Sequence, residues 1–259
     1  TLGYESKAHV EASLDAIRTV IGRYDIMRTA FIWKGLSDPI QVVCRDVELP
    51  VVEEQFADNV VASLNEKYDP SHFRVDVSQG PLVFSVYAED AANDRWLLRI
   101  MYHHLTGDHI SLEILVDEVN HVLQDKQSEL PEPVQYRNYI ANACLRSSQE
   151  EQQAYFTKQL KDITEPTAPY GMVDIWGDGS AVDEQFYWLE RSLTDSIRTV
   201  AKELNVSVAS ICHLGWATVL SKLTGHEKVV FGTLLFGRMQ GGEGADRALG
   251  VFINTLPFR

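Results

Sequence analysis

The chain has 259 residues, of which 45% are hydrophobic and 23% charged, a composition that predicts a folded protein with a sizeable core and excludes disordered and collagen-like classes. Its 37 acidic residues outnumber the 23 lysines and arginines and give a net charge of −14, which disfavours nucleic acid and anionic membrane surfaces as partners. Three cysteines at wide spacings argue against a disulfide framework, and no apolar run is long enough to span a membrane, so a cytoplasmic location is expected.

The first half of the chain alternates amphipathic helices with short strands. Apolar residues three and four positions apart predict a helix over residues 8–24. The turn at Asn93 and Asp94 separates two β-prone runs, which are expected to form a hairpin. The expected elements are helices over 8–24, 59–67 and 110–123, and strands over 29–33, 39–44, 82–87 and 96–102.

The second half opens on a long polar helix, expected from residue 136 to residue 160. Further along, Ser207 is expected to cap a helix that Gly225 ends. A glycine-rich loop over 237–244 lacks the Gly-Lys-Ser/Thr sequence of a phosphate cradle, so a loop at a lobe interface is favoured. The other expected elements are a strand over 185–189, helices over 193–204 and 207–223, and strands over 229–235 and 250–256.

Mixed helices and strands with at least one hairpin favour an α/β fold, of the α+β two-layer sandwich kind, over a doubly wound parallel sheet. Residues 161–184 hold prolines and glycines with little periodicity, as a linker would. The expected domains are an N-terminal lobe over 1–165, an interlobe linker over 166–184 and a C-terminal lobe over 185–259. The chain begins at Thr1 without an initiator methionine, and both ends are expected to be cut from a longer protein.

Three of the eight histidines lie within seven residues, next to an aspartate. If the preceding strand persists to His104, alternation along it predicts that His104 points with an apolar set and that His103 points to the opposite face. A histidine at a strand end, beside an apolar channel, suits a neutral general base near pH 7. The histidine cluster comprises His103, His104, Asp108 and His109, and the apolar set Trp96, Leu98, Ile100 and Tyr102.

Other interpretations of this cluster stay open from the residues alone. A histidine is more often structural than catalytic. Zinc is disfavoured, because adjacent strand residues point apart and no second cluster completes a coordination shell. The pair His103 and Asp108 also resembles the His-x4-Asp dyad of membrane glycerolipid acyltransferases, although the chain lacks their membrane-facing segments.

Residues 103–108, His-His-Leu-Thr-Gly-Asp, resemble the His-His-x3-Asp-Gly motif of the condensation domains of nonribosomal peptide synthetases, relatives of chloramphenicol acetyltransferase. Residues 23–31, Arg-Tyr-Asp-Ile-Met-Arg-Thr-Ala-Phe, resemble the family's Arg-His-Glu-x-Leu-Arg-Thr-x-Phe segment. The resemblance covers essentially the whole chain. Further segments match in the same order, over residues 80–82, 136–139, 231–233, 237–238 and 252–257.

The resemblance implies two chloramphenicol acetyltransferase-like lobes, the first nearly complete and the second partial. It also implies an acyltransferase that forms a peptide bond between peptidyl and aminoacyl thioesters, with His104 as the catalytic residue and His103 packed structurally. No cofactor is expected to bind directly. The substrates would arrive on the phosphopantetheine arms of upstream and downstream carrier proteins, and the adjacent adenylation domain of the same synthetase would be a further partner.

The rest of the motif is expected to support the histidines. By the resemblance, Gly107 and Asp108 hold the loop in place. Asp108 is expected to form an ion pair with Arg28, and Arg238 is the second candidate for that partner.

Two alternatives to a peptide-forming domain remain within this family. One is a stand-alone acyltransferase that uses a soluble acyl thioester. The other is a non-catalytic platform that recruits carrier proteins, and the intact histidine pair favours an enzyme over it.

The family's glycine after the motif aspartate is His109 here. Together with residues 165–171 and 237–247, it resembles the dual epimerisation/condensation subclass, whose members invert the Cα of the upstream residue before forming the peptide bond. In that subclass His104 would also transfer the proton at Cα. The second histidine motif of the subclass lies near the start of the domain, outside this chain.

Overall fold

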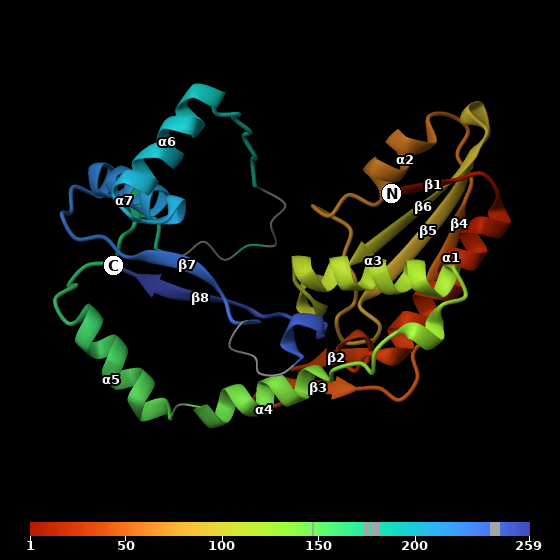
Figure 1. Cartoon of the computed structure of the whole chain (residues 1–259), viewed down its shortest axis with the longest axis horizontal. Helices are drawn as coiled ribbons and strands as arrows, with labels where there is room; N and C mark the ends of the chain where they lie inside the picture. Colours follow the sequence, from red (N-terminus) through yellow and green to blue (C-terminus); the bar gives the residue numbers. More distant parts are fainter. Residues whose placement is uncertain (147, 174–176, 178–181, 239–243) are drawn as a thin grey trace. The chain divides into compact units, whose positions relative to one another are not determined.

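A computed structural model gives the structure of the chain, and it describes residues 1–146, 148–173, 177, 182–238 and 244–259. Residues 174–176 and 178–181 of the predicted linker, and 239–243 of the glycine-rich loop, lie outside the described residues. The chain forms two compact units, and each is described by itself (Figure 1). The first unit consists of Thr1–Ser147 and Phe236–Asn254, and the second of Ser148–Leu235 and Thr255–Arg259.

The compact units divide the chain differently from the predicted lobes. Residues 148–165 belong to the second unit, whereas the segment Phe236–Asn254 belongs to the first. This segment adds core residues to the first unit, among them Leu249 and Phe252, which are 0% and 1% exposed. Apolar burial therefore places it with residues that precede it by more than 100 positions.

The first unit carries most of the strands. Its elements are β1 (Leu2–Tyr4), α1 (Lys7–Arg23), β2 (Thr29–Ile32), β3 (Ile40–Val43), β4 (Val51–Glu54), α2 (Val60–Lys67), β5 (Val83–Asp90), β6 (Arg95–Tyr102), α3 (His109–Leu123) and α4 (Tyr136–Arg146). The later elements are α5 (Gln149–Leu160), α6 (Arg191–Glu203), α7 (Val208–Thr224), β7 (Phe231–Phe236) and β8 (Ile253–Phe258).

A four-stranded sheet in the order β1-β6-β5-β4 forms the centre of the first unit. Strands β5 and β6 pair antiparallel from Val83 opposite Tyr102 to Asp90 opposite Arg95, which confirms the predicted hairpin. Asp94 turns the chain in a left-handed conformation with φ 48°, which aspartate tolerates better than most residues. Strand β1 joins β6 antiparallel, and β4 joins β5 in parallel.

Helices cover both faces of this sheet. The face with Leu98 packs against α1 and α3, which cross it in Figure 1. The opposite face, with Leu97, packs against α2 through Val60 and Leu64. Successive strand residues thus point to opposite layers, and the predicted apolar set of β6 is confirmed as one face of the core. That set, Trp96, Leu98, Ile100 and Tyr102, lies entirely in the cluster of α1 and α3.

Helix α1 matches the helix predicted over 8–24. The side chain of Ser6 caps its first turn by accepting a hydrogen bond from the His9 amide at 3.3 Å. Val10, Leu14 and Ile17 are at most 3% exposed, and their spacing puts them on one face of the helix.

The predicted helix over 136–160 is wrong in one respect, because two helices, α4 and α5, occupy this range. Ser148 begins a new helix: its side chain accepts from the Glu151 amide at 3.2 Å, while the Glu151 carboxylate accepts from the Ser148 amide at 3.0 Å. This reciprocal capping box favours a helix start at Ser148 over continuation of α4.

In the second unit, α6 and α7 confirm the helices predicted there. Ser207 caps α7 by accepting from the Ser210 amide at 3.0 Å, and Gly225 ends it with φ 76°. The strand predicted over 185–189 is wrong: within the described range 182–190 no residue pairs as a strand. The side chains of its aromatic residues face solvent, and Trp188 is 89% exposed.

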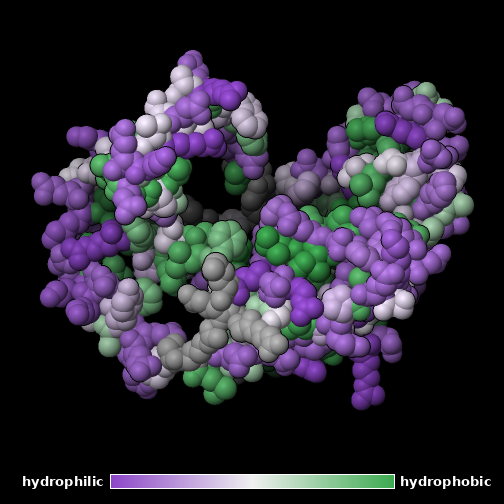
Figure 2. All heavy atoms as spheres, in the orientation of Figure 1, coloured by the Kyte–Doolittle hydropathy of each residue, from purple (hydrophilic) through white to green (hydrophobic). Residues whose placement is uncertain are grey.

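Hydrophilic residues cover most of the molecular face seen in Figure 2. Among the described residues, no single helix has the length and apolar character needed to cross a membrane. Helices α6 and α7 meet that test only when taken together across a bend of 108°.

Candidate functional site

The two adjacent histidines follow the end of β6, in the first unit. Strand pairing reaches one residue beyond the strand, because the His103 amide donates to the Leu82 carbonyl at 3.0 Å. His103 then caps a short 3-10 turn: its Nδ1 accepts from the Leu105 amide at 3.1 Å. With Nδ1 as acceptor, the neutral ring carries its proton on Nε2. Burial, and to a smaller degree the nearby His104, lowers the pKa of His103.

His104 lies at the first position of that turn and is exposed. The strand does not persist to His104, so the alternation expected for His104 does not apply: β6 ends at Tyr102 and a 3-10 turn begins at His104. Within the part of the chain that the structure describes, no group forms a hydrogen bond or ion pair with its imidazole. The fold therefore holds the ring of His103 in the turn and leaves the ring of His104 exposed.

Gly107 is needed for close packing beneath the loop. Its φ of 179° is ordinary extended backbone, but a Cβ there would overlap the Tyr102 hydroxyl and approach the Ser111 Cβ to 2.7 Å. Burial raises the pKa of Tyr102 to about 12, so the phenol stays neutral at physiological pH. Glycine thus allows the turn to lie directly on the partly buried ring of Tyr102.

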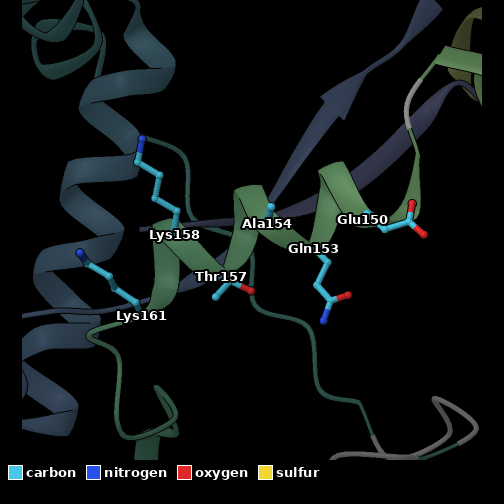
Figure 3. A pocket seen from close by; sticks show the side chains of 6 residues that line it. All are labelled: Glu150, Gln153, Ala154, Thr157, Lys158 and Lys161. Atoms are coloured by element: carbon cyan, nitrogen blue, oxygen red, sulfur yellow. The ribbon is translucent and has the colours of Figure 1, made fainter.

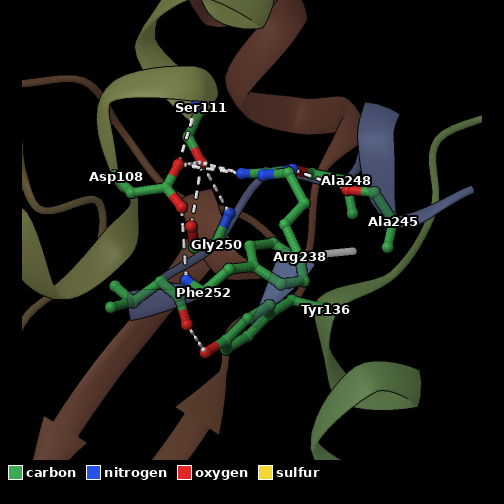
Figure 4. A network of polar contacts seen from close by, with 9 residues as sticks. Asp108, Ser111, Tyr136, Arg238, Ala245, Ala248, Gly250 and Phe252 are labelled. Carbon is green, nitrogen blue, oxygen red and sulfur yellow. Dashed lines mark hydrogen bonds and ion pairs between the residues drawn. The ribbon is translucent and has the colours of Figure 1, made fainter. Parts of the chain in front are cut away.

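Asp108 caps the N-terminus of α3 from a buried position (Figure 4). Its Oδ1 accepts from the Ser111 amide at 2.9 Å and from Arg238 Nη2 at 2.8 Å, and its Oδ2 accepts from the Phe252 amide at 3.3 Å. Burial alone would raise the pKa of Asp108, but the bonds from Ser111 and the charge of Arg238 hold it below its usual value. Asp108 is therefore an ionised structural anchor.

Arg238, the second predicted candidate, is the partner of Asp108. Its Nη1 donates to the carbonyls of Ala245 and Ala248, each at 2.6 Å. Its guanidinium carbon lies 4.0 Å from the centre of the Phe252 ring, a favourable cation–π geometry. Arg238 thereby links the motif aspartate to the turn at residues 245–248.

Arg28 does not pair with Asp108, so the first predicted candidate is wrong. Its Nη1 donates instead to the carbonyls of Cys44 and Arg45, the latter at 3.1 Å. The Arg28 amide also donates to the Asp25 carbonyl at 3.0 Å, at the entry to β2. Arg28 therefore fastens the hairpin of β2 and β3.

Sequence reasoning missed Ser111 and Gly250, which complete the network in Figure 4. The Ser111 hydroxyl lies 2.8 Å from the Gly250 carbonyl and 3.0 Å from its amide nitrogen. Gly250 has φ 150°, and a Cβ there would overlap the Tyr136 ring. The Tyr136 hydroxyl donates to the Val251 carbonyl at 2.6 Å. A serine three residues after a helix cap, and a glycine inside an expected strand, were the available signals.

The first matched segment, residues 23–31, has a structural role. The Asp25 carboxylate accepts from the amides of Tyr136 and Arg137, at 2.9 and 3.3 Å, and so caps α4 from a distant position. Tyr24, where the family pattern has histidine, donates to buried Glu118 at 2.5 Å, and burial raises the pKa of this tyrosine.

Other polar groups stand apart from this network. His109 is exposed and pairs with Glu113 on the next turn at 3.1 Å. Among the described residues, no group of three or more His, Cys, Asp or Glu is placed to hold a metal ion. The pocket in Figure 3 belongs to the second unit and follows one face of α5. It is lined by Glu150, Gln153, Ala154, Thr157, Lys158 and Lys161.

Comparisons with known proteins match this arrangement to one family. The model of the Condensation domain family matches residues 1–259. Malpinin synthetase and malpibaldin synthetase of Mortierella alpina are 42% and 40% identical over 259 residues, which is 99% of this chain. The chain spans only 3% and 5% of the length of these two relatives.

A solved structure confirms the predicted fold class of chloramphenicol acetyltransferase-like lobes. The first condensation domain of the calcium-dependent antibiotic synthetase, in complex with a substrate analogue, gives a TM-score of 0.68 at 18% identity. The match covers 99% of this chain and 62% of that one, so the second lobe is represented in part. The ordered motifs, the buried Asp108–Arg238 anchor and the match over every residue lead to one conclusion: the chain belongs to the condensation-domain family.

Proposed function

We propose that this chain forms the histidine-bearing part of a condensation domain that makes peptide bonds in a multidomain synthetase. The amine of an aminoacyl thioester attacks the carbonyl carbon of a peptidyl thioester. The C–N bond forms, the C–S bond breaks, and the proton that the amine loses ends on the departing thiol. The reaction needs no metal and no redox step.

The observation that carries this proposal is the contrast between the two histidines. His103 accepts a hydrogen bond from its own loop, whereas His104 is exposed and leaves its ring for a substrate amine. We assign His104 to orient the amine and accept its proton, a role that suits a neutral imidazole. Holding the two thioesters together supplies a further large part of the rate.

Asp108 has no acid–base role in this mechanism. Its two oxygens accept from Ser111, Arg238 and Phe252, and no histidine ring in the described structure contacts it. This arrangement does not support the His-x4-Asp dyad of the glycerolipid acyltransferases. His103 and Gly107 have positioning roles within this loop, and Arg238 has one from the segment Phe236–Asn254, through its ion pair with Asp108.

The proposed partners follow from the relatives, which are synthetases. We propose that upstream and downstream carrier proteins deliver the two thioesters on phosphopantetheine arms, and that an adenylation domain loads the downstream carrier. Epimerisation of the upstream residue is a second proposed activity of the same site. The substitution of His109 for the family's glycine favours it.

The test is peptide-bond formation by the whole synthetase polypeptide with two loaded carrier proteins. Replacing His104 by Ala is expected to lower kcat by about 100-fold or more, the usual contribution of a general base. His121→Ala is the matched control, because His121 lies on the helix that follows the loop and, among the described residues, its ring pairs with Asp117 alone. Product formation is measured by mass spectrometry.

The same assay separates the alternatives. Full activity of His104→Ala would refute the catalytic role of His104. Turnover of a soluble acyl thioester in place of the loaded carriers would favour a stand-alone acyltransferase. A folded wild-type protein that binds carriers without forming a bond would favour a recruitment platform. An L-configured donor that yields a product with a D residue would establish the epimerase activity.

A further inference from the structure

We propose that Ser111 is a positioning residue for the proposed reaction, because its hydroxyl joins the motif loop to the chain segment at Gly250. The inference rests on the proposed function and extends it to a residue outside the six-residue motif. Ser111 touches no reacting atom in this scheme and acts through the loop that carries His104.

The Ser111 side chain is buried at the centre of the Asp108 network (Figure 4). Its Oγ lies 2.9 Å from Asp108 Oδ1 and accepts from Arg238 Nη2 at 3.2 Å. It also lies 2.8 Å from the Gly250 carbonyl oxygen and 3.0 Å from the Gly250 amide nitrogen. One hydroxyl therefore lies within hydrogen-bond distance of four polar atoms from three separate parts of the chain.

The backbone of Gly250 depends on this hydroxyl. Its amide donates to Ser111 Oγ, and its carbonyl accepts from the Asp108 amide at 3.2 Å. Without Oγ, the buried amide of Gly250 would lose its partner, and a buried unpaired donor is unfavourable. The segment would then shift, and the bond from the Phe252 amide to Asp108 would shift with it.

The effect reaches His104 through the two fixed ends of its loop. At one end, the His103 amide bonds the Leu82 carbonyl at 3.0 Å. At the other end, Asp108 caps α3, and its position is set by Ser111 and Arg238. Only residues 104–107 lie between these anchors. Moving the second anchor therefore changes the direction of the His104 ring, and misplacement by about 1 Å can cost about 100-fold in rate.

The experiment compares Ser111→Ala with Thr29→Val in the whole synthetase polypeptide. Both variants remove a buried hydroxyl from the first unit, but that of Thr29 bonds the Asp25 carbonyl at 2.9 Å, away from the loop. We measure kcat, the KM for each loaded carrier, and Tm. Ser111→Ala is expected to lower kcat at least about tenfold with each KM within about twofold. Thr29→Val is expected to lower Tm and to keep kcat.

An unchanged kcat for Ser111→Ala at a temperature where the variant is folded would overturn the proposal and leave Ser111 a structural residue. If Ser111→Ala does not fold, Ser111→Cys replaces it, because a thiol fills the space of the hydroxyl but forms only weak hydrogen bonds. An unchanged kcat for Ser111→Cys would likewise overturn the proposal. His104→Ala distinguishes failure of the positioning role of Ser111 from failure of the proposed function. If that variant is inactive while Ser111→Ala is fully active, the positioning role fails and the proposed function stands. Absence of peptide-bond formation by the wild type would count against the proposed function itself.

Discussion

His103 and His104 are neighbours in sequence with different physical surroundings. His103 is held inside its turn by the Leu105 amide, and burial lowers its pKa. His104 lies one residue further on and is exposed. The residue types of the motif pointed to both side chains as candidates, but only the turn that follows β6 gives them different surroundings.

The lowered pKa of His103 predicts a pH-dependent stability. At a pH above the pKa of His103 in the unfolded chain, its ring is neutral in both the folded and the unfolded state. As the pH falls below that pKa, the unfolded chain binds a proton at His103 more readily than the folded chain does. Stability linked to His103 is therefore present above about pH 6.5 and declines as the pH falls from there toward the folded-state pKa. Urea unfolding at pH 7.5 and 5.5 is expected to show a smaller acid loss for His103→Asn than for wild type. Equal losses would contradict this prediction.

The partner of Asp108 shows the limit of sequence reasoning at this scale. A carboxylate in the motif predicted an arginine partner, and the sequence offered Arg28 and Arg238. Local spacing favours neither residue, since both are distant from Asp108 in sequence. The choice depends on where the segment Phe236–Asn254 packs, which no local pattern encodes.

Among the elements, periodicity succeeded where a helix or strand is long and packs on one face. It predicted α1, α3, α6, α7 and the hairpin of β5 and β6. It missed β1 and β4, whose three and four residues are too short for a period to show. The break between α4 and α5 was also missed, because one capping box outweighs helical propensity on both sides.

The contact between α1 and α3 leads to a prediction at this scale. Glu118 of α3 is 4% exposed and accepts from Tyr24 at 2.5 Å and from Arg23 Nε at 2.8 Å. Glu118→Gln removes the charge that both donors bind, and it is expected to lower the free energy of unfolding by about 2 kcal/mol. Urea denaturation measures the change.

The control for Glu118→Gln is Glu113→Gln on the same helix. Glu113 pairs with His109 at the surface, with a side chain 61% exposed. Its replacement is expected to change stability by less than about 0.5 kcal/mol. A similar decrease in the free energy of unfolding for the two variants would show that burial does not make the Glu118 contacts more stabilising than the surface pair of Glu113.

At the scale of the whole molecule, the first unit is discontinuous in sequence. The segment Phe236–Asn254 leaves the second unit and completes the core and the Asp108 network of the first. The motif residues and their order predicted the family and its fold class. They could not predict that Phe236–Asn254 belongs to the first unit, because this placement results from burial between residues that are far apart in sequence.

A substitution at Gly250 tests how strongly the segment Phe236–Asn254 is packed against the rest of the first unit. An alanine there would press its Cβ into the Tyr136 ring at a φ of 150°, and overpacking of this kind is expected to cost about 3 kcal/mol. Hydrogen exchange is expected to rise at the amides of Asp108 and Phe252, which bond across this contact. Gly22→Ala is the control: its Cβ meets nothing within 4 Å, so helix α1 should gain about 0.5–1 kcal/mol. Unchanged exchange in Gly250→Ala would refute the prediction.

The discontinuity of the first unit also sets the order of events during synthesis on the ribosome. Residues up to Ser147 emerge first, but Arg238, Gly250 and Phe252 follow about 100 residues later. At about 5–20 residues per second, this delay lasts roughly 5–20 s. During that interval Arg238 is not available to pair with Asp108, and the core of the first unit lacks the buried residues Leu249 and Phe252. The histidine loop can therefore reach its final form only after most of the second unit has left the ribosome.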